Sequence, residues 1–128
     1  PPDMRLPIAW GLGWPDRVPD ASPACDWTSS HTWTFDPLED GVFPAVRLAR
    51  EAGAIGGTAP AVFNAANEVA VDAFRTGGLT FTGIVDTVGA VVAAHTAVVG
   101  PDFTLEAVSA ADAWARTQAA ELIAVGER

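Results

Sequence analysis

The chain has 128 residues and a mass of 13.2 kDa, which is the length of one ordinary domain. Hydrophobic residues make up 49% of it and charged residues 18%, so the chain can bury a core and is not disordered by composition. Its formal net charge of -9 repels phosphate backbones and anionic lipid. This charge argues against binding to nucleic acid or to a membrane surface.

The use of lysine and cysteine narrows the chemistry further. All seven basic residues are arginine, which excludes Schiff-base chemistry, lysine general bases and a P-loop lysine. The single cysteine, Cys25, cannot form an intramolecular disulfide or a Cys-rich zinc site, and we expect a reducing, cytoplasmic location. No stretch predicts a signal peptide or a membrane span. Because the only methionine is Met4, we expect the chain to be a piece of a longer protein.

Residues 1–42 have the composition of a connector. They hold seven of the ten prolines and four of the five tryptophans, so no long helix is expected there. A short helix is predicted around Leu6–Leu12, ended by Gly13 and Pro15. The alternation of aromatic residues and threonines in Trp27–Phe35 predicts a short strand. We interpret the segment as a connector that lies along a larger body.

Residues 43–125 have helical spacing. Asp40 and Pro44 open the first predicted helix, which ends near Ala52. The second begins at Thr58 and ends before Gly77-Gly78, the third runs from Thr82 to near Val98, and Ser109 caps the fourth. Four amphipathic helices with short connections favour an antiparallel bundle. The predicted fold class is therefore mainly α, a four-helix bundle (43–128) preceded by an irregular, Pro/Trp-rich extended connector (1–42). Small residues should let the helices approach closely: Ala45, Ala49, Ala66, Ala70, Ala73, Ala115 and Ala119.

The two histidines are weak candidates for ligands. His95 falls on the apolar side of the third predicted helix, where a partly buried histidine near a helix C-terminus is the favoured interpretation over a ligand or proton carrier. His31 follows Cys25 by six positions, but the sequence has no second pair at metal-ligand spacing. A surface histidine in the connector is favoured there.

The second predicted helix carries the other candidates. Glu68 and Asp72 lie one turn apart and could bind a divalent cation, but a solvated polar face is the favoured interpretation. Asn67 lies at the border of the apolar face, and we expect its amide to tie the helix to a neighbour or to an adjoining domain. The glycine run Gly53–Thr58 predicts a cap and turn instead of a phosphate site. From the residues alone, no catalytic or metal site follows.

A resemblance to a known family goes further. The order of motifs resembles the C-terminal third of the 1-deoxy-D-xylulose-5-phosphate reductoisomerases. The segment Pro2–Ala9 is similar to the family's P-D-M-R-x-P-I-A, and Trp14–Val18 to W-P-x-R-V. The segment Phe43–Ala49 resembles F/Y-P-x-x-x-L-A, and Asn64–Val71 resembles N-A-A-N-E-x-A-V. The resemblance covers nearly the whole chain.

The resemblance implies a parent enzyme with three parts: an NADPH domain, a catalytic domain with a divalent metal (Mg²⁺ or Mn²⁺), and a C-terminal bundle joined by a linker. The parent would be a cytoplasmic homodimer. In the family pattern the metal carboxylates and the residues that hold the substrate phosphate lie upstream, so neither a catalytic residue nor a bound cofactor is expected here. Pro2, Asp3 and Met4 would lie near the nicotinamide and a mobile lid, or would only end a segment of the catalytic domain.

Three hypotheses follow for the chain itself. The leading hypothesis is the structural, non-catalytic C-terminal part of such a reductoisomerase. The second is a stand-alone helical interaction module without enzymatic activity. The third is a small enzyme that uses Glu68 and Asp72 with a metal ion. The signature residues Asn64, Asn67 and Glu68 are expected to serve packing and not catalysis.

Overall fold

The computed structural model describes residues 3–126, and over that range all regular structure is helical. The predicted mainly-α class is confirmed. The chain divides after Asp36 into two compact units, Pro1–Asp36 and Pro37–Arg128, which are described separately. No helix within residues 3–126 is both long enough and apolar enough to cross a lipid bilayer.

The first unit contains one helix, α1 (Arg5–Gly13), which confirms the helix predicted around Leu6–Leu12. The carboxylate of Asp3 accepts the backbone N–H of Arg5 at 2.9 Å and so satisfies one of the free donors of the first turn. The helix ends before Pro15, whose ring biases Trp14 toward extended backbone. None of the residues of α1 is buried within the described chain. Trp10 and Trp14 pack edge to face with 4.7 Å between their ring centroids.

The strand predicted for Trp27–Phe35 is wrong. The side chains of Trp33 and Phe35 do lie near one another, with 6.3 Å between their ring centroids, as the alternation requires. A strand also needs a partner for its backbone N–H and C=O groups, and the described part of the first unit supplies none. The segment is instead an extended connector with one locally hydrogen-bonded turn. In this turn the carboxylate of Asp26 accepts the N–H and the hydroxyl of Thr28 at 2.9 and 2.6 Å.

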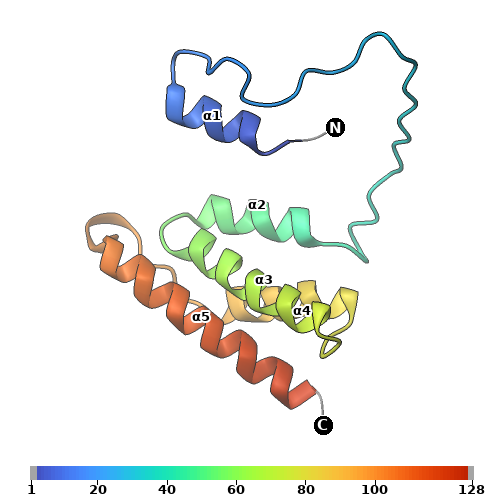
Figure 1. Ribbon diagram of the computed structural model, residues 1–128. Coiled ribbons are helices and arrows are strands. Elements are labelled where there is room, and N and C mark those ends of the chain that lie inside the picture. The colour runs from blue at the N-terminus through green and yellow to red at the C-terminus, as the bar shows by residue number, and fades with distance from the viewer. Residues whose placement is uncertain (1–2, 127–128) are drawn as a thin grey trace. The chain divides into compact units, whose positions relative to one another are not determined.

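The second unit is the predicted four-helix bundle. Its helices are α2 (Ala45–Ile55), α3 (Ala59–Arg75), α4 (Phe81–Ala94) and α5 (Leu105–Gly126), with a 3-10 turn, η1, at Gly100–Asp102. Helix α3 occupies the middle of this unit and packs against α2, α4 and α5 (Figure 1). The amphipathic pattern of α3 explains this place, because its buried positions recur on one broad side: Ala59, Val62, Ala65, Ala66 and Ala70.

The core of the bundle is built from small residues. Helix α5 contributes an alanine at every fourth position, Ala111, Ala115 and Ala119, and each of the three is buried. They form one cluster with residues of α3 and α4, which are Val62, Ala65, Ala66, Val88 and Val91. Alanine side chains let helix backbones approach closely, so the core is thin. Two of the predicted small contact residues, Ala45 and Ala49, are exposed and take no part in it.

Three predicted helix boundaries are wrong, and local hydrogen bonds explain two of them. Thr80, and not Thr82, caps α4, because its hydroxyl oxygen accepts the N–H of Gly83 at 3.1 Å. The hydroxyl of Thr104 accepts the N–H of Ala107 at 3.1 Å, so α5 begins one turn before Ser109. Helix α4 ends at Ala94 and not near Val98.

Candidate functional site

The N-terminal candidates lie at the start of α1. Pro2 lies outside the described residues. Asp3 is engaged by Arg5, whose Nε donates to both carboxylate oxygens at 3.0 and 3.1 Å. These hydrogen bonds lower the pKa of Asp3 to about 2. Met4 leaves most of its side chain exposed within the described chain. The segment therefore presents an ionised, already paired carboxylate and a free thioether.

Glu68 belongs to an ion-pair network between α3 and α5. One oxygen of Glu68 accepts from Arg116 Nη2 at 2.7 Å, and the other accepts from the amide of Asn64 at 3.0 Å. Arg116 also donates through Nε to Asp112 at 2.8 Å. The hydrogen bond from Arg116 is the main cause that lowers the pKa of Glu68, and both acids raise the pKa of Arg116.

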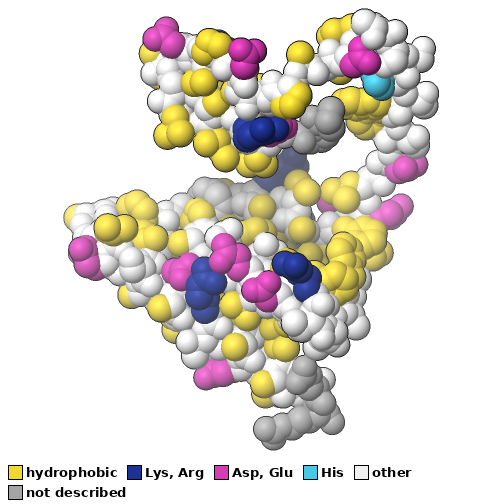
Figure 2. Space-filling view, viewed as in Figure 1, with side chains coloured by type: hydrophobic (Ala, Val, Ile, Leu, Met, Phe, Trp, Pro, Cys, Tyr) yellow, Lys and Arg dark blue, Asp and Glu magenta, His cyan; other side chains and the backbone are white. Residues whose placement is uncertain are grey.

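This network decides between the two interpretations of the acidic pair. Glu68 pairs with Arg116 of α5, while Asp72, one turn further along α3, is exposed. Residues 3–126 hold no group of three or more Asp, Glu, His or Cys side chains placed to bind a metal ion. Glu68 therefore acts in helix packing, while Asp72 lies on the solvated polar face. Figure 2 shows charged side chains of both signs gathered on the visible face of the bundle.

His95 lies at the C-terminal end of α4 instead of inside it, as the C-cap residue. Its Nε2 lies 2.8 Å from the hydroxyl oxygen of Thr58, at the start of α3. Its ring packs on Trp114 of α5 with 5.2 Å between centroids. Burial lowers the pKa of His95, because the charged imidazolium loses water there. The favoured interpretation, a partly buried histidine near a helix C-terminus, is confirmed.

Sequence reasoning missed the partner of His95. Thr58 was expected to cap α3 with its side chain, but it makes no such bond, and its hydroxyl turns to the loop that follows α4. The residue type gave no sign of this, because a threonine before a helix ordinarily predicts a cap. The glycines before it do form the predicted turn, since Gly56 and Gly57 have φ angles of 73° and 52°.

Asn67 lines an apolar groove between the start of α2 and helices α3 and α4. The groove has a volume of about 240 Å³, and its other lining residues are Phe43, Ala45, Val71, Phe81, Thr82, Ile84 and Val85. Phe81 packs edge to face with both Phe43 and Phe74, at 6.1 and 5.8 Å. Within residues 3–126 the amide of Asn67 makes no hydrogen bond to a neighbouring helix, and its contact with an adjoining domain stays a prediction.

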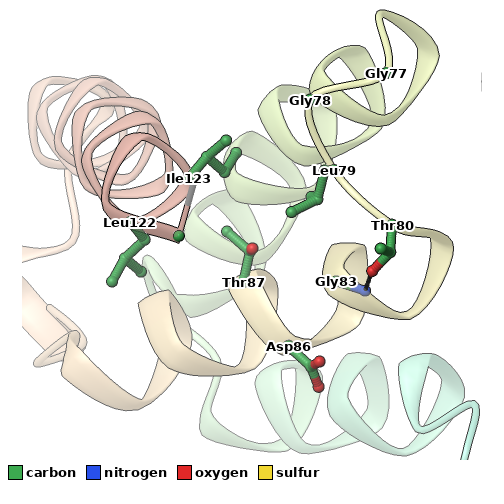
Figure 3. A pocket seen from close by; sticks show the side chains of 10 residues that line it. Gly77, Gly78, Leu79, Thr80, Gly83, Asp86, Thr87, Leu122 and Ile123 are labelled. Carbon is green, nitrogen blue, oxygen red and sulfur yellow. Dashed lines mark hydrogen bonds between the residues drawn. The ribbon is translucent and has the colours of Figure 1, made fainter. Parts of the chain in front are cut away.

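One pocket of the bundle lies where the α3–α4 turn meets the end of α5 (Figure 3). It has a volume of about 470 Å³, and it is lined by Gly77, Gly78, Leu79, Thr80, Gly83, Asp86, Thr87, Leu122, Ile123 and Gly126. The hydroxyl of Thr80 is used in the cap of α4. Figure 3 shows the carboxylate of Asp86 pointing away from Thr87 and Thr80. The pocket thus brings together no nucleophile with a base.

Comparison with known proteins identifies the family of this chain. Residues 1–118 match the family described as the DXP reductoisomerase C-terminal domain. The chain is 66% identical over 125 residues to the 1-deoxy-D-xylulose 5-phosphate reductoisomerase of Kitasatospora griseola, covering 97% of this chain and 32% of that protein. It is 55% identical over 139 residues to the reductoisomerase of Cutibacterium acnes, covering 100% of this chain and 34% of that protein.

Two solved structures are similar as well. The Zymomonas mobilis 1-deoxy-D-xylulose 5-phosphate reductoisomerase in complex with NADPH has a TM-score of 0.71 and 39% identity, covering 96% of this chain and 32% of that one. A DOX-P reductoisomerase in complex with magnesium has a TM-score of 0.75 and 27% identity, covering 100% of this chain and 34% of that one. The chain thus spans about a third of the length of the relatives that it matches.

Proposed function

Because the chain belongs to the family of DXP reductoisomerase C-terminal domains, we propose that it is the non-catalytic, supporting part of an NADPH- and divalent-metal-dependent 1-deoxy-D-xylulose-5-phosphate reductoisomerase. The whole enzyme would isomerise 1-deoxy-D-xylulose 5-phosphate and reduce the product to 2-C-methyl-D-erythritol 4-phosphate, a step of non-mevalonate isoprenoid synthesis. The observation that carries the proposal is a family match over residues 1–118 in a chain one third as long as its relatives.

The described residues of this chain do not assemble a site for a divalent metal. A metal of this class takes several carboxylate oxygens, and residues 3–126 bring no such group together. Both oxygens of Glu68 are occupied by Arg116 and Asn64. Cofactor and metal would therefore be held by the upstream nucleotide-binding and catalytic domains.

The first unit supports a role in joining domains. Helix α1 has nine residues, is largely apolar and buries none of its side chains within the described chain. A helix of this length is marginal in water unless its faces are packed against something. We therefore assign residues 1–42 to the end of the catalytic domain and the linker, and residues 43–128 to the C-terminal bundle. The exposed Trp27 and Trp33 of the linker would lie along the upstream body.

The segment Pro2–Met4 would reach closest to the chemistry. A proline ring and a thioether supply soft apolar walls to the nicotinamide region and its lid. Asp3 would only help to position this segment, because its carboxylate is already paired with Arg5. The whole enzyme would be a homodimer in the cytoplasm.

The test compares this chain with the full-length product of the same gene. With substrate, NADPH and Mg²⁺ or Mn²⁺, the full-length protein should oxidise NADPH and the 128-residue chain should not. Turnover by the 128-residue chain alone would refute the supporting role. If the native gene product has the mass of this chain and lacks upstream domains, the stand-alone interaction module replaces our proposal.

A further inference from the structure

One buried hydroxyl connects the α2–α3 turn to the loop between α4 and α5. Thr58 is fully buried, with a relative exposure of 0%. Its Oγ1 accepts the N–H of Val98 at 3.0 Å and lies 2.8 Å from Nε2 of His95. Its backbone N–H donates to the carbonyl of Val98 at 3.2 Å. Three hydrogen bonds thus join Thr58 to His95 and the loop that follows α4, and one of them depends on the protonation state of His95.

Counting hydrogens fixes that protonation state. A threonine hydroxyl has one hydrogen to donate and two lone pairs that accept. One lone pair of Thr58 takes the N–H of Val98, and the hydrogen needs an acceptor because the site is closed to water. Nε2 of His95 is the acceptor that the geometry offers. His95 is therefore neutral, with its proton on Nδ1, and the Thr58 hydroxyl donates to it.

We propose that Thr58 and His95 form an acid-released latch between the α2–α3 turn and the loop that follows α4. When Nε2 of His95 takes up a proton, it can only donate, to the second lone pair of the Thr58 oxygen, and the buried hydroxyl hydrogen of Thr58 is left without an acceptor. The loop around Val98, held to the same oxygen, then separates from the turn. The device acts within the bundle and does not depend on the proposed function.

The charged groups on the neighbouring elements do not pair with His95 and so do not hold it in one protonation state. The hollow beside His95 is lined by uncharged residues only: Ala94, Thr96, Val98, Ala107, Ala110, Ala111 and Trp114. On α5 the charged residues on either side of Trp114 along the chain are Asp112 and Arg116, and Arg116 donates both to Asp112 and to Glu68 of α3. Desolvation is the cause that lowers the pKa of His95, and it keeps the latch closed near neutral pH.

Trp114 determines which contact of His95 is lost. An imidazolium is attracted to an indole face, so protonation strengthens the contact of His95 with Trp114. The same protonation leaves the buried hydroxyl hydrogen of Thr58 without an acceptor and so weakens the hold on the turn. The released ring therefore stays on α5, and the movement is confined to the side of Thr58 and Val98.

The test is amide hydrogen exchange of the 128-residue chain at about pH 7.5 and about pH 5, with each rate corrected for the intrinsic pH dependence. Protection at the Val98 amide should fall about tenfold at the lower pH, the equivalent of one hydrogen bond. The matched variant is His95→Gln, whose side-chain oxygen can accept from Thr58 at a similar reach and does not titrate. Its Val98 protection should be the same at both pH values.

A second variant and a remote amide keep the test decisive. Thr58→Val preserves the shape but removes the hydroxyl, so Val98 should be weakly protected at both pH values. The amide of Val88, in the core of α4, should stay protected in the wild-type chain. The latch is refuted if Val98 shows no pH dependence, if His95→Gln shows the same loss, or if Val88 loses protection in parallel.

Discussion

Gly57 is the position where the bundle tolerates a side chain least. Its φ angle is +52°, a region that costs a residue with a Cβ about 1–2 kcal/mol. A Cβ at Gly57 would lie 2.1 Å from the carbonyl oxygen of Val98, far inside contact distance. Because that atom belongs to the backbone, the loop must move. The two backbone-linked hydrogen bonds between Thr58 and Val98 are then lost, at about 1 kcal/mol each.

Gly57→Ala should therefore lower the free energy of unfolding by about 3–4 kcal/mol. Two neighbouring glycines are matched controls. Gly56 has a φ of +73° but open space around its missing Cβ, so Gly56→Ala should cost only the conformational part, about 1–2 kcal/mol. Gly53 lies inside α2 with open space, so Gly53→Ala should stabilise by about 0.5–1 kcal/mol.

The assay is urea unfolding of the 128-residue chain and its three variants, followed by circular dichroism of the helices. For a unit of this size 1 kcal/mol corresponds to about 4–8 °C in Tm, so the three variants should separate clearly in a thermal scan as well. If Gly57→Ala costs no more than Gly56→Ala, the close approach to Val98 does not exist in solution and the reasoning is wrong.

Three further predictions concern the core, the ion pairs and the pH dependence. Ala115 of α5 is fully buried against α3, so Ala115→Leu should lower the free energy of unfolding by about 1–3 kcal/mol. The same change at the exposed Ala120 should have little effect in urea unfolding. The Arg116–Glu68 pair is about half exposed, so a double-mutant cycle with Arg116→Met and Glu68→Gln should give a coupling of only about 0.2–1 kcal/mol; a coupling well above that range would show a desolvated pair. Burial lowers the pKa of His95 below its unfolded value of about 6.5, so the unfolded state binds more protons. The contribution of His95 to stability is full above that pH and falls as the pH drops toward the folded pKa. Urea unfolding between about pH 7 and about pH 5 should show this loss in the wild-type chain and not in His95→Gln.

The periodic part of the sequence predicted the bundle well. Four helices were expected in the bundle, and its described residues form four α-helices, because Gly and Pro mark their ends and apolar residues recur at helical spacing. The errors lie at the ends, where the pattern is weakest. Thr82 and Ser109 have the right chemistry for a cap, but Thr80 and Thr104 lie where the chain actually enters the helix. Two equivalent residues within a few positions cannot be ranked from the sequence.

The connector was harder to predict. Alternation in Trp27–Phe35 has the local signature of a strand, and Trp33 and Phe35 keep the spacing that it implies. Whether such a segment becomes a strand depends on a second strand elsewhere, and local sequence carries no information on that. The family motifs behaved differently, because the residues themselves, such as Asn64–Val71, carry the relationship without any knowledge of the fold.

Amino-acid order alone thus determined the helical class, the acidic and lysine-free surface, and the kinship with reductoisomerase C-terminal domains. These depend on local spacing and on composition, which can be read from the sequence without knowing how the helices pack. Tertiary packing of the helices decided two pairings, that of Thr58 with His95 and that of Glu68 with Arg116. The partners are 37 positions apart along the chain in the first pair and 48 in the second. A hydroxyl or carboxylate has several acceptable partners, and tertiary packing selects the one that it can reach.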